Sequence, residues 1–166
     1  MTRTLKIFAL LSLLFSGAIF GFFYAWVCST MWGLDAAEPQ VAIAAMQAMN
    51  ASVRNAVFAP AFFGTPFVLL ATALIARSAG QTRAALLFAA GGLVYLFGGL
   101  VLTMVVNVSM NEALAVTAIP QDTSAAQAIW QAYSCPWQMW NILRTIASGG
   151  ALALTGVAIL AIKPRQ

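Results

Sequence analysis

Four long runs of apolar residues limit what this chain can fold into more than any other feature of its sequence. Each run has about 20 residues, the length that an α-helix needs to cross the hydrocarbon core of a bilayer. A helix satisfies its own backbone hydrogen bonds, so each run can span a membrane. The predicted spans cover residues 7–27, 56–76, 84–106 and 141–162. The sequence therefore predicts a single domain, an all-α integral membrane four-helix bundle with short extracytoplasmic helical segments.

The composition excludes several other classes of protein. Hydrophobic residues make up 62% of the chain and charged residues only 7%, whereas a soluble domain has about 25% charged residues. The net charge of +4 comes from basic residues that stand singly between apolar runs, so we expect no nucleic-acid partner. The chain has no His, which excludes His-based triads and His-ligated metals. We expect neither a metal nor another cofactor.

Basic residues predict the orientation of the spans. They precede the first span, fill the short link between the second and third, and follow the fourth: Arg3, Lys6, Arg77, Arg83, Lys163 and Arg165. Positive residues remain on the cytoplasmic side, so we expect a multi-pass protein of the bacterial inner membrane with both termini in the cytoplasm. A cleaved signal peptide is the alternative for the first span, but its apolar run is too long and no small-x-small cleavage site follows it.

Two longer connections then lie outside, over residues 28–55 and 107–140. In the first we expect a helix over residues 41–50, with Pro39 near its start, because good helix formers dominate there. In the second we expect a helix over residues 124–133 and a turn at Pro136 before the fourth span.

Each of these connections also carries one cysteine, Cys28 in the first and Cys135 in the second. In an oxidising compartment the two thiols can pair and tie the connections together. Two unpaired thiols are the alternative.

Polar side chains with hydrogen-bonding reach gather at the outer ends of the spans: Gln47, Asn50, Arg54, Asn55, Asn107, Asn111, Asn141 and Arg144. Asn107 and Asn111 are four residues apart, so they share a face if the third span continues as a helix. Trp137, then Trp140 or Asn141, and Arg144 also share a face. Two such faces turned inward make a pocket with apolar walls and a few convergent polar groups, as ligand sites usually have.

Each of these residues also has a simpler interpretation. Tryptophans near a membrane boundary commonly form an interfacial belt, and a single Asn at a helix end is often a cap. Arg144 can extend its side chain toward the headgroups. Burying it unpaired inside a span costs about 2.5–3.5 kcal/mol, so the whole set favours a pocket more strongly than any one member does.

Several spaced motifs resemble the anthrone oxygenase-like family of small four-span membrane proteins. They are MQAMN (46–50), RN (54–55), PAFFG (60–64), TMVVNVSMN (103–111), WQAY (130–133) and WQMWNILR (137–144). The resemblance covers about residues 15–155. Fungal members oxidise anthrones to anthraquinones with molecular oxygen and without a known metal or flavin. This sequence departs from the pattern at Ser109, where a proline is expected between two asparagines; the departure loosens the local turn and bears more on the substrate than on the fold.

The resemblance implies roles for the polar cluster. Arg144, Asn107, Asn141 and Asn50 are the candidate catalytic residues, which hold a developing oxyanion as preorganised donors do in a dry site. The candidate substrate-binding residues are Asn111, Trp137, Trp140, Tyr133, Gln47 and Asn55, and the aromatic members stack on a flat ligand. Glu112 is the nearest candidate for a base, and a solvated loop acid is the alternative for it.

Two functions follow as hypotheses. The first is a cofactor-independent oxygenase of a lipophilic phenolic, anthrone-like or quinol-like compound, so that the expected partner is a hydrophobic aromatic small molecule or a quinone within the lipid bilayer. The second is a non-catalytic membrane protein that holds a lipid, a quinone or a partner helix in the same outward-facing cleft. Association into a homo-oligomer is compatible with either one. A transporter is less expected, because the spans show no inverted repeat and no acid for ion coupling.

Overall fold

A computed structural model describes residues 2–163, and Arg165, one of the basic residues used for orientation, lies outside this range. Every element within it is helical. The α-helices are α1 (Arg3–Ala25), α2 (Met31–Asp35), α3 (Pro39–Ser52), α4 (Phe58–Ser78), α5 (Thr82–Tyr95), α6 (Val108–Ala115) and α7 (Thr123–Leu160). Three π-helical segments, Trp26–Thr30, Leu96–Val101 and Thr103–Asn107, join some of them end to end.

Four continuous helices are long and apolar enough to cross a membrane. They run over Arg3–Asp35, Phe58–Ser78, Thr82–Ala115 and Thr123–Leu160, and each contains or overlaps one predicted span. The prediction of an all-α four-helix bundle is thereby confirmed, and the chain is a multi-pass membrane protein. Three of the four helices extend well beyond the hydrocarbon length, since they have 33, 34 and 38 residues against the roughly 20 that a span requires.

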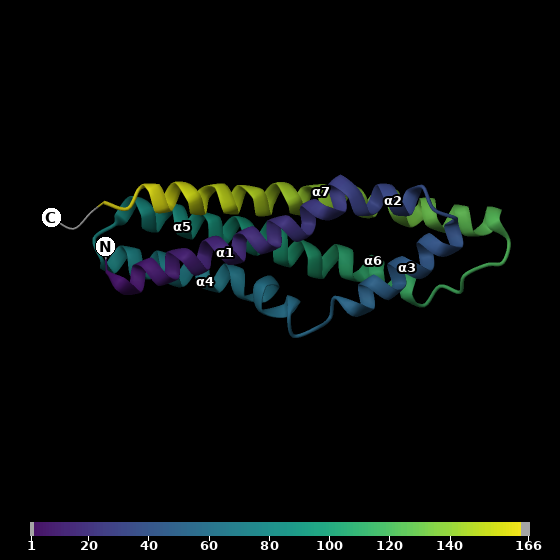
Figure 1. Cartoon of the computed structure of the whole chain (residues 1–166), viewed down its shortest axis with the longest axis horizontal. Coiled ribbons are helices and arrows are strands. Elements are labelled where there is room, and N and C mark those ends of the chain that lie inside the picture. Colours follow the sequence, from purple (N-terminus) through teal and green to yellow (C-terminus); the bar gives the residue numbers. More distant parts are fainter. Residues whose placement is uncertain (1, 164–166) are drawn as a thin grey trace.

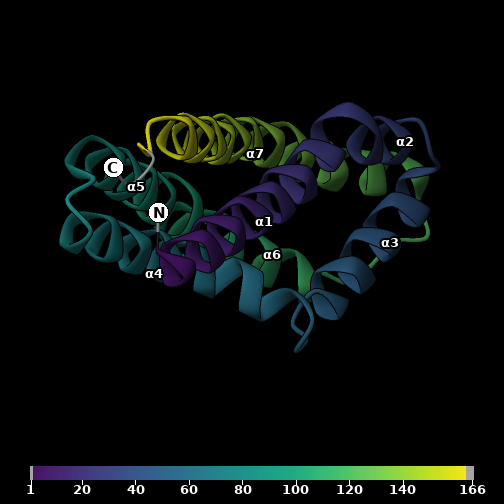
Figure 2. The same cartoon turned by 60° about the vertical axis from the view of Figure 1, so that its left-hand side comes forward.

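The four helices pack as a closed bundle in which α1 contacts α4 and α7, and α5 contacts the same two helices. Figure 1 shows both chain ends at one end of the bundle, together with the turn between α4 and α5. The short helices α2, α3 and α6 lie toward the other end, beside the beginning of α7 (Figure 1). The view in Figure 2 shows α1 crossing obliquely in front of the bundle.

The end that holds the termini is closed by apolar packing and by two hydrogen bonds. Leu5, Leu69 and Phe88 belong to one buried cluster there. Gln81, in the turn between α4 and α5, donates to the Lys163 carbonyl at 3.2 Å and accepts from the Lys163 N–H at 2.9 Å. The chain therefore returns to its own starting end, as an even number of spans requires.

A proline in the middle of α4 is compensated by a tyrosine from α5. Pro66 has no N–H, so the carbonyl four residues earlier, that of Phe62, loses its helical donor. The Tyr95 hydroxyl donates to this carbonyl at 2.9 Å, and Tyr95 is fully buried. Gly99 leaves room for the ring, because a Cβ at this position would lie 2.6 Å from it. One hydroxyl thus satisfies a buried acceptor that would otherwise face only apolar groups.

We expect Tyr95→Phe to lower the free energy of unfolding by about 0.5–2 kcal/mol, because it leaves the Phe62 carbonyl unpaired in an apolar bundle. In a Pro66→Ala background the restored N–H can serve that carbonyl, so the same change should cost clearly less. The wild type, the two single variants and the double variant form a double-mutant cycle. Titration with sodium dodecyl sulfate in mixed micelles measures the free energy of unfolding of each. Equal costs in both backgrounds would show that Pro66 does not create the need for the hydroxyl.

The structure of the outer connections agrees in part with the prediction from the sequence. The predicted helix over residues 41–50 is confirmed as part of α3, with Pro39 at its first position, where the missing N–H costs nothing. Residues 124–133 are helical as predicted, with the Asp122 carboxylate capping α7.

The predicted turn at Pro136 is wrong. Pro136 lies inside the continuous helix α7, and Ala132, whose carbonyl loses its donor, is exposed.

The two cysteines are unpaired in the structure. Cys28 lies half-buried in the π segment Trp26–Thr30, and Cys135 is exposed on α7. The alternative of two free thiols is therefore the one that the structure shows, in place of a disulfide.

Candidate functional site

A cavity of about 570 Å³ opens between the outer halves of the helices. Ligand cavities typically have about 300–1,000 Å³, so this one can hold a ligand of several fused rings. Its walls come from α1, from the first residue of the π segment Trp26–Thr30, from the end of α3, from the α3–α4 connection, from the start of α4, from the segment between Thr103 and Glu112, and from α7. Segments far apart in the sequence thus surround one space.

Seven aromatic side chains line the cavity: Phe22, Phe23, Trp26, Phe58, Phe62, Phe63 and Trp137. Phe22 and Phe58 have ring centroids 4.7 Å apart, and Phe58 stacks on Phe62 at 5.2 Å. Trp26 packs on Trp137 at 5.1 Å. A wall of flat, apolar side chains suits a flat aromatic ligand, because rings gain from offset or edge contacts as well as from burial.

Arg144 is the charged group of the interior, and only 4% of its surface is exposed. Its Nη2 donates to the Asn141 Oδ1 at 2.8 Å, and its Nη1 donates to the Thr103 Oγ1 at 3.3 Å. The guanidinium carbon lies 4.7 Å from the Phe23 ring centroid and 5.1 Å from that of Trp137, within the range of cation–π attraction. The alternative in which Arg144 extends toward the headgroups is therefore wrong.

No carboxylate balances the charge of Arg144. Within residues 2–163 the one ion pair is that of Arg54 with Glu112. The Arg144 Nε has no hydrogen-bond partner although it is buried. A buried charge without a counter-charge is costly, and Arg144 lines the cavity. The geometry therefore leaves a place for an anionic or strongly polarised oxygen beside this guanidinium.

A second set of hydrogen bonds converges on Asn111, which also lines the cavity. Its Oδ1 accepts from the Tyr133 hydroxyl at 2.8 Å and from the Trp137 Nε1 at 2.9 Å. The Asn50 Nδ2 in turn donates to the Tyr133 hydroxyl at 3.4 Å. These bonds fix the ring of Trp137 beside the guanidinium of Arg144, while Tyr133 stays behind the wall.

The two remaining candidate asparagines are buried behind the cavity. Asn141 ties α7 to α1 by donating to the Phe23 carbonyl at 3.2 Å, while its oxygen holds Arg144. Asn107 is fully buried at the end of the π segment Thr103–Asn107, and neither atom of its amide has a hydrogen-bond partner. An amide with both groups unpaired is rare in a protein interior and costs about 1–3 kcal/mol for each group.

Three candidate substrate-binding residues have other surroundings. Gln47 donates to the carbonyls of Leu114 and Thr117 at 2.8 and 3.0 Å, which ties α3 to the end of α6 away from the cavity. Asn55 lines the cavity but also caps α4, since its Oδ1 accepts from two backbone N–H groups at 2.8 and 2.9 Å. Trp140 is half-buried and does not line the cavity.

The tryptophans divide between the two interpretations that the sequence left open. Trp32 is 66% exposed, as a member of an interfacial belt would be. Trp26 and Trp137 line the cavity instead. Trp130 is buried and donates to the Asp35 carboxylate at 2.9 Å. Trp26, together with Phe23 and Thr103, contributes to the site although the sequence did not single it out for that role.

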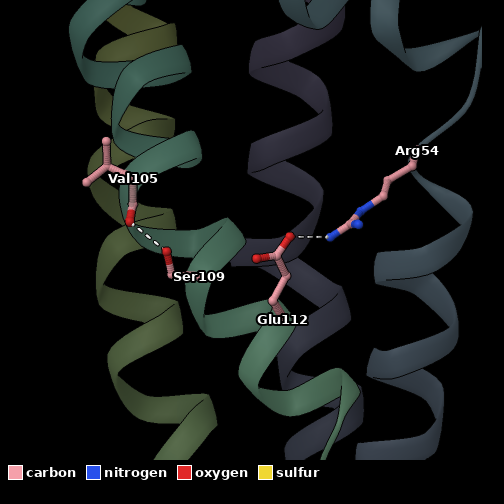
Figure 3. A network of polar contacts seen from close by, with 4 residues as sticks. All are labelled: Arg54, Val105, Ser109 and Glu112. Carbon is pink, nitrogen blue, oxygen red and sulfur yellow. Dashed lines mark hydrogen bonds and ion pairs between the residues drawn. The ribbon is translucent and has the colours of Figure 1, made fainter.

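Arg54 and Glu112 form the rim of the cavity. Arg54 Nη2 lies 3.4 Å from the Glu112 Oε1, and the two side chains are 60% and 61% exposed. Figure 3 shows the pair bridging the α3–α4 connection and α6. Glu112 is thus on a helix, and not in a loop as the solvated alternative supposed.

Ser109 also lies on α6, where the sequence suggested a loosened turn. Its hydroxyl donates to the Val105 carbonyl at 3.0 Å (Figure 3). The segment remains helical through Ala115. The expected loosening at this position is wrong, because the serine hydroxyl bonds back to the helix.

Together these features define a class: a multi-pass helical membrane protein with an open cavity lined by aromatic side chains and a buried cation that has no carboxylate partner among residues 2–163. The chain matches the model of the anthrone oxygenase family over residues 49–154 and belongs to that family. The match includes the whole cavity wall except Phe22, Phe23 and Trp26. No curated protein and no solved structure matches the chain.

Proposed function

We propose that this protein is a membrane-embedded, cofactor-independent oxygenase of a lipophilic phenolic, anthrone-like or quinol-like substrate. One observation carries the proposal: the buried Arg144 guanidinium faces a cavity of about 570 Å³ and has no carboxylate partner within residues 2–163. An oxyanion that develops on a bound aromatic ketone or phenol would supply the missing negative charge. Membership of the anthrone oxygenase family supports the same substrate class.

The reaction needs the protein to bind, deprotonate and shield its substrate. Loss of a proton from an anthrone gives an enolate-like anion, and this anion can pass electrons directly to dioxygen. For anthrone the overall change is one dioxygen consumed, one anthraquinone formed and one water released. Two hydrogens leave the methylene carbon, and one oxygen atom of dioxygen becomes its carbonyl. The anion is the species that preorganised donors stabilise most.

The roles of the residues follow from their depth. Arg144 contacts the substrate oxygen, while Asn141 holds the guanidinium; Asn50 lines the cavity and donates to the Tyr133 hydroxyl. Asn107 supplies a buried amide whose two groups are free. Trp137 and the phenylalanines stack on the rings. The basic residues Lys6, Arg77 and Arg83 lie at the end of the bundle opposite the cavity. We therefore propose that the cavity end faces the outer side of the bacterial inner membrane and that both termini are in the cytoplasm.

The proposal is tested by oxygen uptake and product identification with purified protein in lipid vesicles, using anthrone and a panel of lipophilic quinols. We expect one quinone formed for each dioxygen consumed. Ala59→Phe should block turnover, because Ala59 lines the cavity, whereas Ala153→Phe, on the exposed side of α7, should not. Wild-type protein that copurifies with an aromatic compound or a lipid but turns over nothing on the panel would show a non-catalytic binder instead.

A further inference from the structure

The four acids of this chain have different environments, and only one reaches the cavity. Asp35 accepts hydrogen bonds from Trp130, Ser134 and Gln138. Asp122 caps α7, and Glu38 is exposed at the start of α3. Glu112 alone among them lines the cavity.

The other titratable side chains can be excluded as the base in the same way. The chain has no His, and the residues that line the cavity include no Lys, Tyr or Cys. The two arginines on its wall, Arg54 and Arg144, carry only hydrogen-bond donors. Glu112 is therefore the one side chain along this cavity that can accept a proton from a bound substrate.

The backbone places this carboxylate over the opening. Val108 and Glu112 are four residues apart on α6, so they share one helix face, and both line the cavity. Arg54 meets Glu112 from the α3–α4 connection at 3.4 Å, as Figure 3 shows. The ion pair holds the carboxylate at the rim, where water can carry a proton away.

We propose that Glu112 is the general base of the site and that substrate binds with its oxygen inward and its acidic hydrogen at the rim. The inference rests on the proposed function. A substrate C–H bond breaks, its electron pair remains on the substrate as the enolate, and the proton forms an O–H bond with the Glu112 carboxylate. Dioxygen then accepts electrons from the enolate. The proton leaves Glu112 to water, which returns the base to its starting state.

This arrangement selects a substrate class. Arg144 is 4% exposed and Glu112 is 61% exposed, so the oxyanion contact and the base lie at different depths. A flat fused-ring ketone whose acidic CH₂ lies across the ring from the carbonyl can present its oxygen to the buried group and its CH₂ to the exposed one. Anthrone has this geometry. A simple phenol, whose acidic proton is on the oxygen itself, would bring its proton to Arg144 and not to Glu112.

The test separates proton transfer from oxidation. Without oxygen, in deuterated buffer, wild-type protein should accelerate deuterium uptake at the anthrone methylene, followed by NMR. Glu112→Gln should slow this exchange by about 10²–10⁴-fold, the usual contribution of a general base. Glu38→Gln should exchange like wild type. Arg54→Gln should lose less than about tenfold, because an exposed ion pair contributes little energy.

Each other outcome has a definite meaning. If Glu112→Gln exchanges deuterium at the wild-type rate and still consumes oxygen, the assignment of the base is overturned and the oxygenase proposal stands. If Arg54→Gln slows deuterium exchange as much as Glu112→Gln does, the effect belongs to the ion pair, and the assignment of Glu112 as the base is also overturned. Wild-type protein that neither exchanges nor consumes oxygen would remove both proposals. Thermal unfolding of the variants, with Glu112→Asp as a second carboxylate, excludes a folding defect.

Discussion

Replacing Arg144 by Met should lower kcat/KM for an anthrone-like substrate by about 10²–10³-fold, because it removes the donor that faces the developing oxyanion. Met has a similar length and no charge, so the cavity keeps its shape. The same change should leave stability unchanged or raise it, since the wild-type charge is buried without a carboxylate partner. Steady-state oxygen uptake and thermal unfolding in detergent measure the two effects.

Two further variants make this result specific. Arg144→Lys keeps the charge but loses the planar group that lies over the Phe23 and Trp137 rings and reaches two acceptors, so we expect an intermediate activity. Arg83→Met removes an exposed arginine at the other end of the bundle and should not change turnover. Wild-type kinetics in Arg144→Met would contradict a role for the guanidinium in the transition state.

Replacing a buried asparagine by leucine should have opposite effects on stability at Asn107 and at Asn141. Asn107→Leu removes two unpaired polar groups and should stabilise the fold by about 1–3 kcal/mol. Asn141→Leu removes the bonds to the Phe23 carbonyl and to Arg144 and should destabilise it by a similar amount. Both variants should lose turnover, Asn107→Leu because the wall segment between Thr103 and Val108 loses its buried amide. Unfolding in mixed micelles and oxygen uptake measure these effects.

A loss of stability in Asn107→Leu would mean that the amide already has a partner in the resting protein. The case for Asn107 as an unpaired buried amide would then fail. Full activity in a stabilised Asn107→Leu would remove it from the site altogether.

Much of the fold could be predicted because run length and charge act locally. About 20 uncharged residues suffice to define a span, and Pro39 marked the start of α3. The convergence of Asn50, Asn111 and Arg144 could also be anticipated, because all of them lie at the outer ends of spans. Their position along the helices was visible in the sequence, although their partners were not.

The π-helical segments account for what the sequence did not reveal. A π turn contains an extra residue, so the face that a residue presents can no longer be counted from an α-helical period. Trp26 and Thr103 begin two such segments and line the cavity. Gln47 shows a different limit, because its two carbonyl partners are 67 and 70 residues away in sequence.

These wide turns also decide where the chain tolerates a change in the number of its residues, apart from their kinds. Successive α-helical residues are 100° apart around the axis. A π turn already contains one extra residue, so deleting one residue within Leu96–Val101 could rewind the segment as a regular helix and leave the chain beyond it in nearly the same orientation. One residue deleted from the regular helix α5 would instead turn the following chain by about 100°, and Thr103, Val108, Asn111 and Glu112 would leave the cavity wall together, although no side chain had been altered.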